Sequence, residues 1–182
     1  MVFSNRGRAE AFERIRSESA LLTTVVEIGV ERSASFRSLV ERIDQSDVIV
    51  HLTCSRFKST SLAGQTLLAS AGPDVRYLRV QVSCELSDLA LLSVVGHELQ
   101  HVVEIVSAPS VVDDKSFARL FRTIGFSTCL GSEPDRFETA AALAAGERVR
   151  AEYLHYSELA AEAKHRSAGR VNGAAVREPP LE

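Results

Sequence analysis

The feature that most constrains this chain is a long stretch of helical periodicity whose apolar side chains are interrupted by histidine and glutamate. From Leu89 to Val106, Leu and Val recur at helical spacing and form one continuous face. Ser87 is placed to cap this helix at its start. Pro109 lies just beyond its end, where proline stops a helix because it lacks a backbone N–H. The pattern predicts one long helix with an apolar face.

The middle of this helix carries the sequence His97-Glu98-Leu-Gln-His101. Residues four apart share one face of a helix, so both imidazoles can point at the same ion. Zinc binds histidine nitrogens at about 2.0–2.1 Å in a tetrahedral arrangement. Glu98 lies about 100° further round the helix, where it can act as general base on a metal-bound water. The alternative is two incidental histidines, but unpaired buried polar groups cost about 1–3 kcal/mol each.

Two histidines need a third protein ligand to complete a zinc site. Glu104 is the nearest acid, but it lies about 10.5 Å of helix rise from His97, too far for one ion to bridge on an unbroken helix. Glu104 is therefore expected either to support a ligand from outside or to be an ordinary surface acid.

Glu138 is the better candidate for the third ligand. It is expected near the start of the last helix, at the head of a face of small apolar residues, and a carboxylate buried there needs a counter-charge or a metal. The alternative is an acid in the first turn that complements the helix dipole. The fallback ligands, each with a sufficient role as a capping residue, are Glu133, Asp113 and Asp114.

The remaining pattern predicts an α+β domain. Helices are expected over 19–30, over 36–43 with a cap at Ser33 or Ser35, from Asp113 or Asp114 to Gly125, and from Ser132 to about Tyr156. Strands are expected over 47–54, 62–70 and 75–82, and the turn sequence Ala-Gly-Pro-Asp at 71–74 joins the last two into a hairpin. Residues 1–18 are interpreted as an N-terminal extension, 19–160 as the domain and 161–182 as a disordered tail.

Composition excludes several functions. The chain has 182 residues, one domain by length, and a net charge of −3, so no basic surface for nucleic acid is expected. No apolar run reaches the roughly 18 residues of a transmembrane segment, and the N-terminus lacks a secretory h-region, so a cytoplasmic protein is predicted. The alternative is a secreted protein whose leader is missing because the start site was misassigned. Cys54, Cys84 and Cys129 are expected to be free thiols, although one pair could form. The sequence indicates no oligomeric state.

With these motifs in place, the chain resembles zincin metallopeptidases of the gluzincin type, in which the two histidines of HExxH and a glutamate from a later helix bind zinc. More narrowly, it is similar to small uncharacterised bacterial HExxH proteins of the peptidase class. The resemblance covers about residues 20–155 and rests on segments that run in the same order: Asp-Val-Ile-Val at 47–50, Leu-Leu-Ala-Ser-Ala-Gly at 67–72, Arg-Tyr-Leu-Arg-Val at 76–80, Gly-His-Glu-Leu-Gln-His at 96–101 and Phe-Glu-Thr-Ala-Ala at 137–141.

The resemblance implies a zincin-like fold, in which a small, mostly antiparallel sheet packs on the HExxH helix and the metal lies between two helices. It implies that Zn²⁺ is bound by His97, His101 and Glu138, with Glu98 as general base in the hydrolysis of a peptide or protein substrate. It also implies an edge strand beside the cleft that pairs with an extended peptide. The strand at 75–82 is the natural candidate.

The chain departs from thermolysin-like enzymes around the third ligand. Phe137 stands before Glu138 where Asn is usual, and Ala142 replaces the Asp that orients a ligand histidine, so that partner is unassigned. The residue that would steady the oxyanion is also open, because Tyr153 and His155 lie more than about 20 Å of helix rise beyond Glu138. The remaining candidates for the oxyanion are His51, Arg56 and Tyr77.

These departures keep two other hypotheses open. The first is a non-catalytic, zinc-stabilised binding module descended from a peptidase. The second is a helical domain that binds no metal.

Overall fold

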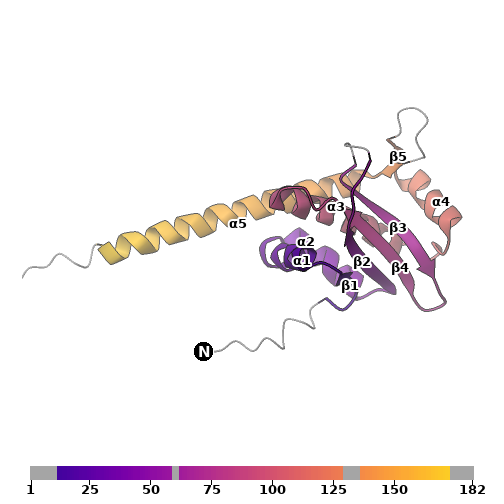
Figure 1. Cartoon of the computed structure of the whole chain (residues 1–182), viewed down its shortest axis with the longest axis horizontal. Coiled ribbons are helices and arrows are strands. Elements are labelled where there is room, and N and C mark those ends of the chain that lie inside the picture. Colours follow the sequence, from indigo (N-terminus) through magenta and orange to yellow (C-terminus); the bar gives the residue numbers. More distant parts are fainter. Residues whose placement is uncertain (1–11, 59–61, 129–135, 173–182) are drawn as a thin grey trace, which may run out of the picture.

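The computed structural model describes residues 12–58, 62–128 and 136–172 (Figure 1). Their helices and strands are β1 Ile15–Ser17, α1 Ala20–Arg32, α2 Ala34–Asp44, β2 Val48–Cys54, β3 Gly64–Ala71, β4 Arg76–Val82, α3 Asp88–Val106, α4 Asp114–Ile124, β5 Phe126–Ser127, β6 Phe137–Glu138 and α5 Ala140–Asn172. The predicted α+β class is confirmed at this level.

The main sheet has the strand order β1-β2-β4-β3. The predicted hairpin of β3 and β4 is confirmed as an antiparallel pair, but β2 pairs with β1 and with β4 in parallel. The expectation of a mostly antiparallel sheet is therefore wrong. The hairpin folds back so that β4 lies between β2 and β3, which also makes β3 the edge strand in place of the strand at 75–82. The alternation of apolar and polar residues along a strand predicts which side chains are buried, but it does not identify which strands pair.

Alternate residues of the two central strands form the core face of the sheet. Val48, Val50 and Leu52 of β2 are fully buried, as are the core-facing residues of β4, namely Leu78, Val80 and Val82. The residues between them are partly or fully exposed. The helices α1, α2 and α3 all contact this sheet. Burying each such side chain contributes roughly 1.5–3 kcal/mol, so this layer fixes the position of α3.

The helix α3 is the centre of the molecule and crosses α5 closely. A Cβ atom at Gly96 would lie 2.8 Å from Cγ2 of Val149, so only glycine fits at this crossing. Ser93 Oγ donates a hydrogen bond of 2.9 Å to the Gly146 carbonyl at the same contact. By length and composition α3 could also cross a bilayer, but 56% of that stretch is buried inside the fold, as in a core helix. This crossing sets the first turns of α5 beside His97.

The C-terminal end of α3 is held by a buried arginine. Arg76 of β4 forms two hydrogen bonds of 2.7 Å with the Asp47 carboxylate. Its Nη1 also donates to the carbonyls of Ile105 and Ala108, each at 2.9 Å. Those carbonyls lie in the last turn of α3 and just beyond its end, where cations are favourable. The guanidinium therefore anchors α3 to the sheet.

Local capping signals set the helix starts largely as predicted. Ser33 accepts a hydrogen bond from the Phe36 N–H and caps α2, and Asp113 forms a capping box with Ser116 at the start of α4. Gly125 follows α4 as expected, with an extended backbone. Glycine at this position lets the backbone of Glu138 come close, because a Cβ on residue 125 would lie 2.5 Å from the Glu138 carbonyl oxygen. That approach allows β5 to pair with β6.

The last helix differs from its prediction at both ends. Phe137–Glu138 form β6, and α5 begins only at Ala140, where Thr139 Oγ1 accepts a hydrogen bond from the Ala142 N–H. The expected cap at 132–135 lies outside the described residues. At the other end α5 continues to Asn172 and projects past the body of the molecule (Figure 1). Apolar periodicity is lost there because little packs against the helix, while the Ala, Glu, Lys and Arg of this stretch favour helix.

Two further expectations for the chain are wrong. The assigned N-terminal extension contains β1, which pairs with β2. Its three residues lie among charged ones and carry too short a pattern to detect. Cys54 and Cys84 form a disulfide with a Cα–Cα distance of 5.4 Å, instead of two free thiols. The end of β2 and the segment after β4 bring these cysteines together. Residues 1–11, 173–182 and Cys129 lie outside the described parts of the chain.

Candidate metal centre

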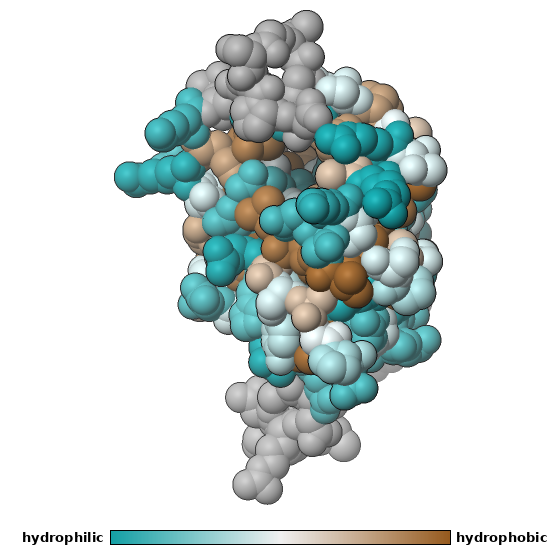
Figure 2. Space-filling model, turned by 90° about the vertical axis from the view of Figure 1, so that its right-hand side faces the viewer, coloured by the Kyte–Doolittle hydropathy of each residue, from teal (hydrophilic) through white to brown (hydrophobic). Residues whose placement is uncertain are grey.

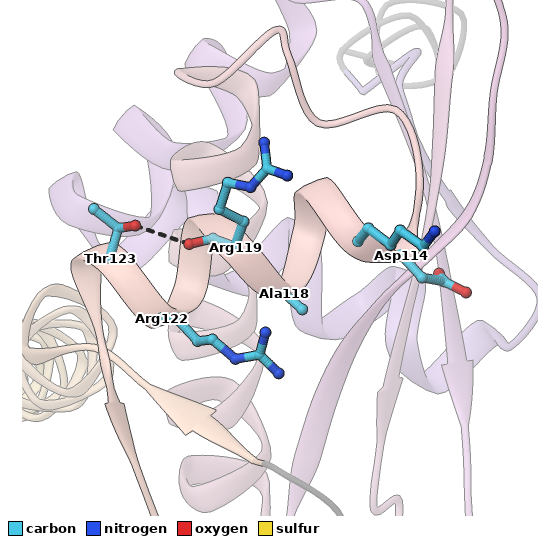
Figure 3. Close-up of a pocket in the computed structure, with 6 residues that line it drawn as sticks. Asp114, Ala118, Arg119, Arg122 and Thr123 are labelled. Carbon is cyan, nitrogen blue, oxygen red and sulfur yellow. Dashed lines mark hydrogen bonds between the residues drawn. The ribbon is translucent and has the colours of Figure 1, made fainter.

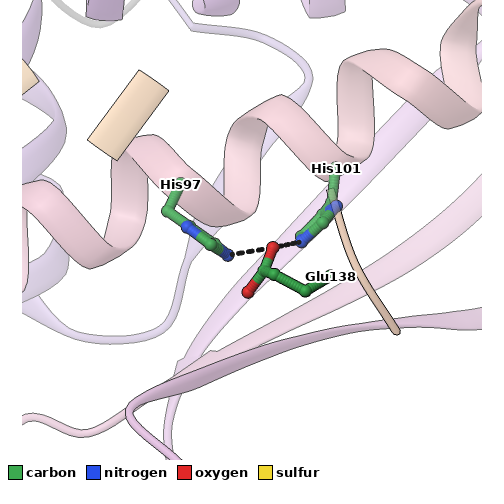
Figure 4. Close-up of side chains that lie close together, drawn as sticks. All are labelled: His97, His101 and Glu138. Atoms are coloured by element: carbon green, nitrogen blue, oxygen red, sulfur yellow. Dashed lines mark ion pairs between the residues drawn. The ribbon is translucent and has the colours of Figure 1, made fainter. Parts of the chain in front are cut away.

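The structure brings the three predicted ligand residues together. The imidazoles of His97 and His101 point from α3 toward the Glu138 carboxylate, which comes from β6 (Figure 4). Glu138 Oε1 lies 3.2 Å from Nε2 of each histidine. One donor atom from each residue falls within 4.8 Å of the others. Three side chains that an ion could bind together thus converge from two segments distant in sequence.

Helical spacing and aromatic packing fix the two rings. His97 and His101 lie one turn apart, with ring centroids 5.0 Å apart and planes at 79°. The His101 ring also contacts the edge of Phe121 from α4, with centroids 5.3 Å apart. A ring held on one side by an aromatic neighbour has few orientations, so its Nε2 stays directed at Glu138.

Burial and charge act against each other in this cluster. Burial lowers the pKa of His101, but its hydrogen bonds with Glu104 and Glu138 outweigh burial and raise the pKa to about 9. Burial raises the pKa of Glu138, but hydrogen bonds from His101 and His97 outweigh it and lower the pKa to about 2. The Glu138 carboxylate is therefore ionised at neutral pH. Because a metal ligand must give up its proton, a cation here would replace the proton on His101.

Glu98 lies deeper than the three clustered residues and is only 4% exposed. Thr66 of β3 donates a hydrogen bond of 2.8 Å from Oγ1 to Glu98 Oε2. Gly64 leaves room for the carboxylate, since a Cβ at Gly64 would lie 2.5 Å from Oε1. Burial raises the pKa of Glu98, as is typical of a carboxyl that takes part in proton transfer near neutral pH. The edge strand thus holds Glu98 in place beside the cluster.

Glu104 supports the ligand residue His101 from outside the cluster. This is the first of the two roles that the sequence left open for Glu104. Its Oε2 accepts a hydrogen bond of 2.9 Å from His101 Nδ1. Its Oε1 accepts one of 2.7 Å from Thr139 Oγ1. The side chain is 10% exposed, so the interpretation as an ordinary surface acid is wrong. Sequence reasoning missed Thr139, because a threonine after a glutamate carries no signal beyond helix capping.

The other candidates from the sequence lie elsewhere. His51 and Tyr77 face away from the helices on neighbouring strands, with ring centroids 6.2 Å apart. Arg56 forms an exposed ion pair of 3.1 Å with Glu85. None of these three oxyanion candidates lines the cavity at the cluster.

The fallback ligands do not join the cluster either. Asp113 and Asp114 begin α4, where Asp113 caps the helix. Glu133 lies outside the described residues.

A cavity of about 820 Å³ opens onto the cluster. Residues 62–67, in and just before β3, form one wall; Phe117 and Phe121 of α4 and Leu143 of α5 contribute to the others. Among the described residues that line it, Arg136 is the one arginine, and no lysine is present. Figure 2 views the end of the molecule that carries α4 and β3, where apolar residues gather in a central band bordered by hydrophilic ones. The cavity thus places apolar walls beside the polar cluster.

A second hollow, of about 450 Å³, lies on α4 (Figure 3). All its lining residues come from that helix: Asp114, Lys115, Ala118, Arg119, Arg122 and Thr123. It shares no residue with the cavity at the histidines, so it is a feature of the helix surface.

Comparisons with known proteins leave the site to be argued from its own geometry. No family model matches the sequence, no curated protein matches it, and no solved structure matches the fold.

Proposed function

We propose that this protein is a zinc-dependent peptide hydrolase with a zincin-like arrangement. The observation that carries the proposal is the position of Glu138 Oε1, 3.2 Å from Nε2 of both His97 and His101. A carboxylate from a distant segment has no need to meet two imidazoles one helical turn apart unless all three serve a common purpose. The His97-Glu98-Leu-Gln-His101 sequence of the helix supports the same interpretation independently.

The donor set fits zinc. Two imidazole nitrogens and one carboxylate oxygen are ligands that zinc accepts, and catalytic zinc sites use three protein ligands with one open position. The hydrogen bond from His101 Nδ1 to Glu104 leaves Nε2 free to bind. When bound, zinc would act as a Lewis acid that polarises the scissile carbonyl and makes water more acidic.

Glu98 supplies the proton transfers. Its buried carboxylate accepts a proton from the attacking water as the new C–O bond forms. It then returns that proton to the leaving amine as the C–N bond breaks. Burial raises the pKa of Glu98, which makes its carboxylate a stronger base than an exposed one. Thr66 keeps the carboxylate oriented during both steps.

The edge strand offers a place for the substrate. Along β3, backbone groups on the side away from β4 have no strand partner in the described sheet, and residues 62–67 line the cavity. An extended peptide can add to such an edge through main-chain hydrogen bonds. The apolar walls from Phe117, Phe121 and Leu143 would then contact its side chains.

The Cys54–Cys84 disulfide bears on where this activity takes place. Structural disulfides persist in oxidising compartments and are rare in the cytosol. We therefore propose an extracytoplasmic site of action, in place of the cytoplasmic one expected from the sequence.

Substituting the proposed base tests the reaction. Glu98→Gln should retain zinc and lose hydrolysis of a quenched-fluorescence peptide library by about 100-fold or more, the contribution of general acid–base catalysis. Glu158→Gln makes the same chemical change at an exposed position on α5 and should cleave like the wild type. Equal cleavage by Glu98→Gln and wild type, each with zinc bound, would reject this mechanism.

A non-catalytic zinc-stabilised binding module is the second candidate. It is favoured by the positions of His51, Arg56 and Tyr77, which leave the cavity without the expected oxyanion donor from among these residues. It predicts that a chelator lowers the melting temperature while no peptide in the library is cut.

A further inference from the structure

We infer that Glu104 is a positioning residue that orients two of the three proposed metal ligands at once. It bonds directly to one ligand and reaches the other through Thr139. This inference rests on the proposed metal centre, but not on peptide hydrolysis. It extends the functional unit of α3 from HExxH to His97-Glu98-Leu-Gln-His101-Val-Val-Glu104.

The first link is the contact between Glu104 and His101. Residues three apart lie side by side on a helix, and Glu104 Oε2 accepts from His101 Nδ1 at 2.9 Å. Once His101 gives up its second proton to a cation, a ring that donates from Nδ1 carries its lone pair on Nε2, the nitrogen 3.2 Å from Glu138. The carboxylate therefore fixes both the tautomer and the direction of this ligand. Among the described residues, no carboxylate is found at Nδ1 of His97.

The second link runs through Thr139 to Glu138. Glu104 Oε1 accepts from Thr139 Oγ1 at 2.7 Å, and the Thr139 backbone N–H donates to Glu138 Oε1 at 2.9 Å. Thr139 Oγ1 also accepts from the Ala142 N–H at 3.0 Å, so its single donor is committed to Glu104 while the oxygen caps α5. Thr139 is 2% exposed, which leaves water little access to replace these bonds. Glu104 thus ties the backbone that presents Glu138 to the helix that presents both histidines.

A purely structural explanation predicts something different. If Glu104 only joined α3 to α5, its loss would lower stability and leave metal affinity unchanged in the folded protein. If it orients the ligands, metal affinity falls even where the metal-free fold is intact. Outer partners of metal-bound histidines typically contribute about 10- to 100-fold in affinity.

The test measures zinc affinity of the full chain by competition with a chromophoric chelator. Glu104→Gln should bind zinc about 10- to 100-fold more weakly than wild type, with an unchanged far-ultraviolet circular dichroism spectrum. Its cobalt-substituted form should show shifted visible absorption bands, because the ligand geometry changes. Glu158→Gln, the exposed control, should match the wild type in both measurements.

Substitutions at Thr139 test the same connection while leaving the carboxylates of Glu104 and Glu138 in place. Thr139→Val removes the hydroxyl between Glu104 and the start of α5 and should weaken zinc binding, whereas Thr139→Ser keeps the hydroxyl and should bind like wild type. Adding Thr139→Val to Glu104→Gln should weaken binding by less than the two single effects combined, because the residues act through one connection.

Two results would overturn the inference and identify what has failed. If wild type binds zinc and both Glu104→Gln and Thr139→Val bind it equally well, Glu104 has no positioning role and the metal centre stands. If wild type binds neither zinc nor cobalt, the proposed metal centre fails, and this inference fails with it. Weakened binding by the variants without any peptide cleavage by wild type supports the inference and rejects only the hydrolase.

Discussion

Two groups of charges lie against the helix α3, and they differ in their balance. At its C-terminal end, Arg76 meets one carboxylate, Asp47, and two helix carbonyls, so the formal charges cancel. In its middle, the carboxylates of Glu98, Glu104 and Glu138 surround two imidazoles. Burial raises the pKa of Glu98, but even without Glu98 the two formal negative charges of Glu104 and Glu138 exceed the one proton on His101.

This difference indicates which of the two groups needs something from outside. Buried charges are costly unless they are paired. Each of the three guanidinium nitrogens of Arg76 donates to the Asp47 carboxylate or to a backbone carbonyl. The middle group is paired only in part, and a divalent cation would offset its excess negative charge. This difference is what the proposed metal centre would explain: the group at the end of α3 is neutralised within the fold, and the group at its middle is not.

Breaking the balanced group should have the larger effect on stability. Arg76→Met should lower the free energy of unfolding by about 3 kcal/mol, at the low end for breaking a buried ion pair, because water can reach the partly exposed Asp47. Urea unfolding measures this loss. Zinc affinity, measured at a temperature where the variant is folded, should match wild type. A parallel loss of zinc affinity would mean that the two groups are not separate.

Adding a divalent cation to the group in the middle of α3 should change the free energy of unfolding somewhat less. Zinc at 100 times its dissociation constant should raise the free energy of unfolding of the wild type by about 2.7 kcal/mol. Glu138→Gln should lose nearly all of this gain, since it removes an anionic ligand. Paired urea titrations with zinc and with a chelator measure the gain, using each metal-free protein as its own baseline. An equal gain in both proteins would place the zinc elsewhere.

Local features of the fold were predictable from sequence because neighbouring residues determine them. The caps at Ser33 and Asp113 and the turn at 71–74 are short patterns with one physical meaning each. Strand order was not predictable, because the same alternation in β4 suits an edge or a central position. For β6, Phe137 and Glu138 fit a helical pattern equally well, and only the distant β5 makes them a strand.

In the candidate site too, residues of a local motif could be predicted from the sequence, whereas contacts set by the fold could not. His97, Glu98 and His101 form one local motif, and Glu138 could be predicted because a buried acid near small residues needs a partner. The role of Glu104 stayed open, since spacing alone does not say which way a side chain turns. In thermolysin-like enzymes the acid that orients a ligand histidine would stand at position 142 on the last helix; here Glu104, three residues after His101 on α3, accepts from that histidine instead.

The smallest expected effect is the loss of the Asp47 contribution to stability at low pH. The hydrogen bond from Arg76 lowers the pKa of Asp47 in the folded protein, although partial burial opposes it. A carboxyl with a lowered folded pKa contributes stability above its unfolded pKa of about 3.9, and this contribution is lost as the pH falls through the folded value. The stability difference between wild type and Asp47→Asn should therefore be constant near neutral pH and shrink below about pH 4.

Thermal melts of the metal-free proteins across this range, with a chelator present, measure the difference. Asp74→Asn makes the same substitution at an exposed turn and controls for the loss of a carboxylate as such. The comparison between wild type and each variant cancels the other acids that titrate at low pH, Glu138 among them. If the difference between wild type and Asp47→Asn were the same at every pH, the Asp47 charge would contribute nothing to holding Arg76. The balanced group would then owe its stability to the helix carbonyls alone.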